Sequence, residues 1–144
     1  MAAFVQLDEC KPSYEFPKYF LATHAMELLL KAFLAANGVS KRHLARKLSH
    51  DLNAILGKSE AKGLLISDEL RAYVSSLQAI NCDYDLRYPG GFRIVAPPSA
   101  ECIRVTEVLR EMVRPIISRA HIDATIQFTS DTRHLKGKAI RWSD

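Results

Sequence analysis

The segment Pro17–Asn37 restricts the fold of this chain more than any other part of the sequence. Proline fits the first turn of a helix, where its missing N–H has no partner to lose, and Asn37-Gly38 supplies a left-handed stop. Apolar side chains surround most of the circumference between these ends: Leu21, Met26, Leu28, Leu29, Leu30, Phe33 and Leu34. A helix that is apolar on nearly all sides must lie at the centre of a bundle, or be covered on a second side by a partner chain.

One polar stripe interrupts this apolar helix. His24, Glu27 and Lys31 have the spacing that places side chains along one line of a helix. The two charges make the segment a poor membrane span despite its length, so we expect no membrane insertion. The stripe is therefore the first place to look for a ligand site or a buried polar network.

The rest of the chain predicts further helices, which gives an all-α fold of four to five helices in one domain over residues 1–122. Ser40 can cap a short helical turn through Arg46. Later helices are predicted over 49–62, over 67–84 and from residue 99 onward. Pro115 predicts a kink or an end near residues 113–114, because proline cannot donate a helical hydrogen bond.

Three segments lack helical periodicity and are predicted to be irregular or extended. Residues 1–15 form a lead-in, residues 92–95 a short extended piece, and residues 123–144 a basic tail that is extended or partly disordered. Ile126 and Phe128 alternate as in a strand.

Charge and cysteine content limit the kinds of partner and the cellular compartment that we expect for this protein. The net charge is +4, and +3 of it lies from Arg114 onward. A basic tail suits a nucleic-acid backbone, and solvation of the tail is the simpler alternative. The three cysteines are far apart and lack a CxxC spacing, which predicts a reducing compartment. The first ten residues lack a secretory pattern, so a cytoplasmic location is expected.

Four short motifs occur in an order that resembles the HEPN superfamily of small helical bundles. They are the HAMELLLKA segment from His24, Leu48-Ser49-His50-Asp51-Leu52, Asn81, and Leu86-Arg87-Tyr88-Pro89. The resemblance spans roughly residues 17–120. It implies a bundle that is often a two-fold dimer, with roles in RNA cleavage, toxin–antitoxin systems, nucleotide binding or protein scaffolding.

The ribonucleases of this superfamily carry an Arg followed four to six residues later by a His. No His follows Arg87 at that spacing. Arg114 and His121 have six residues between them, but about one such pair is expected by chance in a chain of this composition. We therefore favour a non-enzyme. Arg114 and His121 stay the candidates for a metal-independent ribonuclease, with Arg on the phosphate and His as acid or base.

Six side chains are candidates for one polar cluster: Glu27, Lys31, His50, Asp51, Arg87 and Tyr88. Burying several charges is unfavourable unless they pair well, so the cluster is either a structural network or a ligand site. We favour the network, in which His50-Asp51 caps a helix and Arg87 binds a carboxylate. His24 and Glu27 have a metal-ligand spacing, but acids are few and Lys31 would repel a cation, so no metal site is expected.

These observations favour a non-catalytic HEPN-like module that forms a homodimer and binds RNA or a protein partner, without a cofactor. The candidate nucleic-acid contacts are in the tail: Arg133, Lys136, Lys138 and Arg141. The alternatives are a toxin-type ribonuclease and a nucleotide-binding domain with its pocket near Lys31, His50 and Arg87.

Overall fold

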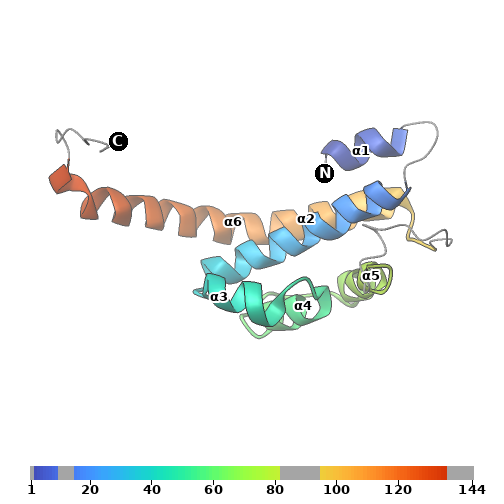
Figure 1. Cartoon of the computed structure of the whole chain (residues 1–144), viewed down its shortest axis with the longest axis horizontal. Coiled ribbons are helices and arrows are strands. Elements are labelled where there is room, and N and C mark those ends of the chain that lie inside the picture. Colours follow the sequence, from blue (N-terminus) through green and yellow to red (C-terminus); the bar gives the residue numbers. More distant parts are fainter. Residues whose placement is uncertain (1, 10–14, 82–94, 136–144) are drawn as a thin grey trace, which may run out of the picture.

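A computed structural model describes residues 2–9, 15–81 and 95–135 as an all-α bundle packed around one central helix (Figure 1). Its six α-helices are α1 (Ala2–Glu9), α2 (Glu15–Ala36), α3 (Lys41–His43), α4 (Leu52–Glu60), α5 (Asp68–Ala79) and α6 (Ser99–Asp131). A π-helical turn, η1 (Leu44–Leu48), follows α3, and a 3₁₀ turn, η2 (Arg133–Leu135), follows α6. The described residues contain no strand. The predicted all-α bundle is confirmed, but the described residues form six α-helices and not the predicted four to five, because α1 and the short α3 add to the longer helices.

The central helix α2 ends as its sequence predicts. Gly38 has a φ of +79°, which is the left-handed conformation that glycine adopts without strain. The N–H of Gly38 donates to the carbonyl of Ala35 at 3.0 Å, and that of Val39 donates to Leu34 at 3.0 Å. This pair of hydrogen bonds is a Schellman motif, which satisfies the last carbonyls of the helix.

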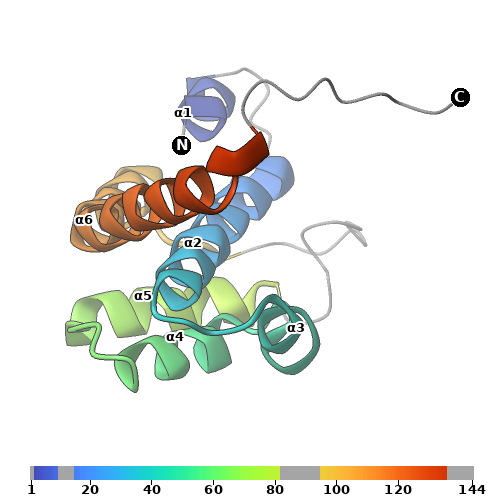
Figure 2. The same ribbon diagram turned by 90° about the vertical axis from the view of Figure 1, so that its left-hand side faces the viewer.

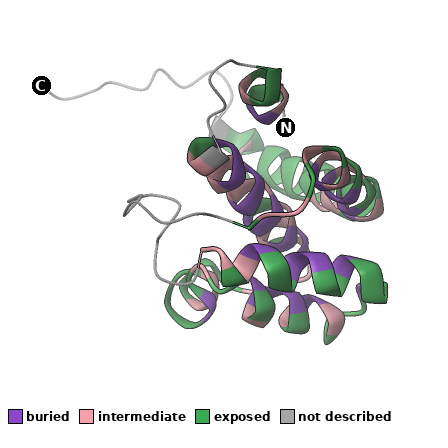
Figure 3. Ribbon diagram, turned by 90° about the vertical axis from the view of Figure 1, so that its right-hand side faces the viewer, coloured by how far each residue is buried: buried purple, intermediate pink, exposed green. Residues whose placement is uncertain are grey.

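Helix α2 lies between α6 on one side and α4 and α5 on the other (Figure 2). Buried residues gather along it (Figure 3), and those with the least exposure are Ala22, Met26, Leu30 and Leu34. Leu28 is its exposed large apolar side chain, with 53% of its surface exposed. The prediction that this helix is central is therefore confirmed, and its many apolar sides are covered by four helices, α1, α4, α5 and α6.

The predicted irregular lead-in is wrong for residues 2–9, which form α1. Phe4 is buried and meets the ring of Tyr19 edge to face, with centroids 6.1 Å apart. The helix is short, and helices of this length are marginal alone. Its stability comes from contacts with α2, which a periodicity search along the chain cannot detect.

Pro115 does not end the last helix, because α6 runs without interruption from Ser99 to Asp131. Pro115 leaves the carbonyl of Glu111 without a donor, and both residues are exposed, so water can replace the lost hydrogen bond. The prediction of an extended tail is therefore wrong for residues 123–131, and so is the strand reading of Ile126 and Phe128. The rest of the predicted tail lies mostly outside the described residues.

The remaining boundaries differ by a few residues from those predicted. Ser67 caps α5 as expected, its hydroxyl accepting from the N–H of Leu70 at 3.2 Å. Helix α4 begins at Leu52 and not at Ser49, because Asp51 is its N-cap. The predicted extended piece at 92–95 lies outside the described residues except for Val95.

One helix segment in the described part, Phe16–Ala36, is long and apolar enough to cross a membrane by length and composition alone. The core helix of a water-soluble bundle and a signal sequence meet the same criterion. Here Met26 and Leu30 of that segment are fully buried among the other helices.

Candidate functional site

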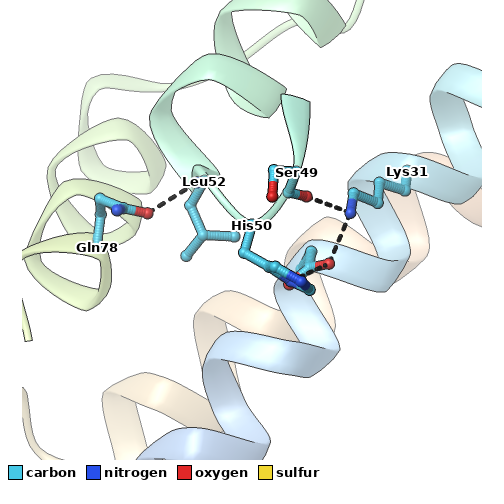
Figure 4. A network of polar contacts seen from close by, with 6 residues as sticks. Lys31, Ser49, His50, Leu52 and Gln78 are labelled. Atoms are coloured by element: carbon cyan, nitrogen blue, oxygen red, sulfur yellow. Dashed lines mark hydrogen bonds and ion pairs between the residues drawn. The ribbon is translucent and has the colours of Figure 1, made fainter. Parts of the chain in front are cut away.

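Three of the predicted cluster residues meet at the middle of α2 (Figure 4). Lys31 Nζ donates to Glu27 Oε1 at 2.7 Å, and His50 Nδ1 lies 3.0 Å from Glu27 Oε2. Lys31 also donates to the backbone carbonyl of Ser49. Only 7% of the Glu27 side chain is exposed, so the carboxylate depends on these partners rather than on water.

The electrostatics of Glu27 follow from these contacts. Burial alone would raise the pKa of Glu27. The hydrogen bonds from Lys31 and His50, with the attraction of their charges, outweigh burial and hold the pKa of Glu27 below its usual 4.5. Glu27 is thus a paired anion near neutral pH, without the raised pKa that a general acid would need.

The turn between η1 and α4 is fastened to the bundle by this network. Ser49 has a φ of +45°, which strains a residue with a side chain. The N–H of Asp51 closes the turn by donating to the carbonyl of Leu48 at 3.1 Å, and the N–H of Leu52 donates to Gln78 Oε1 at 2.8 Å (Figure 4). Contacts from α2 and α5 therefore hold a strained turn in one position.

Asp51 does not join the cluster. Its carboxylate accepts from the N–H of Ala54 at 2.9 Å and caps α4, while the side chain stays exposed. The predicted capping role is confirmed for Asp51, whereas His50 turns to Glu27. Arg87 and Tyr88 lie outside the described residues, so their predicted roles stay predictions.

His24 lies one turn before Glu27, and no hydrogen bond or ion pair joins the two side chains in the described part of the chain. Its ring stacks on Phe20, with centroids 6.0 Å apart and planes 3° from parallel. Its buried Nδ1 has no hydrogen-bond partner among the described residues. That part of the chain also holds no group of three or more His, Cys, Asp or Glu side chains that could bind a metal ion.

Arg114 and His121 are both on α6; Arg114 lies beside α2, where it lines a hollow with Leu29, and His121 lies in the part of the helix that extends past the bundle. Both side chains are exposed, and Arg114 pairs with Glu111 at 3.6 Å. Their positions differ by seven, which is nearly two full turns along the helix. Within one chain they therefore share a face of the helix, about 10 Å apart along its axis.

Of the predicted nucleic-acid contacts in the tail, Arg133 lies in the described part. It is exposed at the start of η2. Lys136, Lys138 and Arg141 lie outside the described residues.

The sequence analysis missed a second basic region, which lines a cavity of about 530 Å³. We call this the basic pocket, and its described lining residues are Ser40, Arg42, His43, Arg46 and Lys47. Arg42, Arg46 and Lys47 are exposed, while Leu48 on the same segment is buried. The signal was present in the sequence, since residues 38–50 contain four Lys or Arg and no acid.

A second buried charge was also missed. Lys18 is 3% exposed, and its Nζ lies 2.9 Å from Asp8 Oδ1 and 3.0 Å from Ser99 Oγ. The hydrogen bonds from Ser99 and then from Lys18 lower the pKa of Asp8. This contact joins α1 to the starts of α2 and α6, so it is a structural link between three helices.

Comparisons with protein-family models, with curated proteins and with solved structures find no match for this chain. What is shown is a small all-helical domain with no family identified.

Proposed function

We propose that this chain is a non-catalytic HEPN-like module that forms a homodimer through the outward half of α6 and binds nucleic acid. The outward half of α6 is defined here as residues 114–131. The observation that carries the proposal is the surface of this segment, which extends past the other helices (Figure 1). Every residue from His121 to Asp131 is exposed, yet the segment includes large apolar side chains.

The apolar row that attaches α6 to the bundle continues into this outward half. The row runs through Leu109 and Val113, which are fully buried. Ile117, Ala120, Ala124 and Phe128 extend it with steps of four, three, four and four residues. Such steps keep side chains on one seam of a helix that packs against another helix. Phe128 is 68% exposed in the single chain, so the seam has no cover there.

A second copy of the same chain fits this seam better than an unlike partner. Arg114 and Arg119 precede Asp123 and Asp131 along the helix. Antiparallel packing of two copies would therefore place the positive half of each helix beside the negative half of the other. The HEPN resemblance, which implies two-fold dimers, points in the same direction.

The state of the polar cluster supports a non-catalytic role. Glu27, Lys31 and His50 satisfy one another and a backbone carbonyl, as a structural network does. Arg114 and His121 fit the spacing of the ribonuclease signature. A toxin-type ribonuclease is therefore the alternative function, and cleavage of RNA by the protein would favour it over this proposal. The proposed nucleic-acid binding rests on the net charge of +4 and on residues 38–50, which contain four Lys or Arg and no acid.

Sedimentation equilibrium tests the dimer directly. We expect the wild type to have the mass of two chains and Phe128→Asp to weaken association by at least about 30-fold, the effect of losing one well-packed anchor. Ile122→Asp is the matched control. Ile122 is 56% exposed, but two residues from Ala120 and from Ala124, so it faces away from the seam. A wild type that stays monomeric, or a dimer broken by Ile122→Asp and not by Phe128→Asp, contradicts the proposed interface.

A further inference from the structure

We infer that the basic pocket on residues 40–47 binds the phosphate groups of a nucleic-acid strand. The inference rests on the proposed nucleic-acid binding and goes beyond it by assigning the site to α3 and η1 rather than to the C-terminal tail. The pocket combines concave shape, cations without a carboxylate partner among the described residues, and a fixed backbone.

The cations of the pocket lack carboxylate partners in the described part of the chain, unlike the arginines of α5 and α6. Arg71 pairs with Glu60, and Arg104 pairs with Glu69. Arg110, Arg114 and Arg119 each pair with an acid on their own helix. No ion pair with a described carboxylate involves Arg42, Arg46 or Lys47, and residues 38–50 supply no acid. Cations gathered in this way repel one another, so an anion bound among them lowers their free energy.

The backbone under these cations is held in place before any ligand arrives. The hydroxyl of Ser40 accepts from the N–H of His43 at 3.3 Å, which caps the segment at its start. Leu48 is buried in the core at its end, where Lys31 and His50 fix the following turn. Only the side chains of Arg42, Arg46 and Lys47 then have to be ordered, which reduces the entropy lost on binding. The network of Glu27, Lys31 and His50 therefore also holds the end of the segment that carries the basic pocket.

Phosphate is the anion that this set of donors suits best. A guanidinium group presents a planar fork of N–H donors that matches two phosphate oxygens, and Lys47 adds a point charge. Arg42 and Arg46 are four residues apart, so their Cβ atoms are separated by about 6 Å on a helix and can reach neighbouring phosphates of one strand. Contacts of this kind do not depend on base sequence.

Binding of a short fluorescein-labelled single-stranded RNA, followed by anisotropy, tests the assignment. The double variant Arg42→Gln/Arg46→Gln removes two exposed positive charges of the pocket. Arg71→Gln/Arg104→Gln removes two exposed charges elsewhere, so both variants have the same net charge. We expect the pocket variant to bind at least about ten-fold more weakly, and its plot of log affinity against log salt to flatten by about 1.4, the value for two lost phosphate contacts. The matched control should change both quantities much less.

The other arms separate this inference from the proposed function. Wild-type binding that both double variants weaken equally would retain nucleic-acid binding but overturn the pocket as its site. No wild-type binding at low salt would overturn both. If polyglutamate displaces the RNA as readily as unlabelled RNA does, the ligand of the pocket is an acidic protein and the inference is overturned. If millimolar inorganic phosphate alone displaces the RNA, the pocket is a site for free phosphate. Unchanged helical circular dichroism in the pocket variant is expected, because both side chains are exposed.

Discussion

Replacing Glu27 by alanine is expected to lower the free energy of unfolding by about 3 kcal/mol, as breaking a buried ion pair does when one partner is removed. Lys31 and His50 lose the carboxylate that they share, and Ser49 loses part of the support for its strained backbone. Urea denaturation measures this change. Glu60→Ala is the control, because Glu60 also pairs with an arginine but at the surface, where such a pair contributes little.

The effect of Glu27→Ala has a pH dependence whose sign follows from the lowered pKa of Glu27. A carboxyl whose pKa is lower in the folded chain stabilises the fold fully above its unfolded value of 4.5, and this contribution is lost as the pH falls through the folded value. The difference between wild type and variant should therefore be constant near neutral pH and shrink well below pH 4.5. Equal stability of the two proteins at neutral pH would mean that the network does not hold the fold.

Leu30→Ala is expected to lower the free energy of unfolding by about 3 kcal/mol, since it removes a fully buried side chain and leaves a cavity. Leu28→Ala, two residues away on the same helix, removes the same atoms from a side chain that is 53% exposed. Its loss should be below about 1 kcal/mol. Both are measured by urea denaturation. Equal losses of unfolding free energy in the two variants would contradict the orientation of α2 or show that a partner covers Leu28. The proposed dimer interface on α6 does not predict such cover.

Local sequence signals predicted the elements that depend on local physics. Pro17 and Gly38 indicated the extent of α2, and Ser67 indicated the start of α5, because caps and helix stops act within one turn. Helix α1 was not predicted, since the burial of Phe4 against Tyr19 joins segments that are separate in sequence. The prediction that the last helix ends near Pro115 was wrong for a related reason. An exposed proline is tolerated where water can satisfy the freed carbonyl, and exposure depends on the fold.

The candidate site was predicted in part. The stripe spacing of Glu27 and Lys31 predicted that they lie together, and His50 joined them because η1 returns the chain to α2. Asp51 takes its predicted capping role and does not join the cluster, since one carboxylate can either cap α4 or enter the cluster. The basic pocket was not predicted because a concave arrangement of Arg42 and Arg46 depends on the fold, although the sequence shows that no acid lies near them along the chain.

The central claim is that the chain binds nucleic acid without cleaving it, and one titration tests it most directly. Labelled RNA is titrated with wild-type protein at several salt concentrations, and the RNA is then recovered and sized. We expect full-length RNA at every point and a linear fall of log affinity with log salt. RNA fragments that disappear with Arg114→Ala or His121→Ala would contradict it in favour of a ribonuclease, and the absence of binding at low salt would contradict it outright.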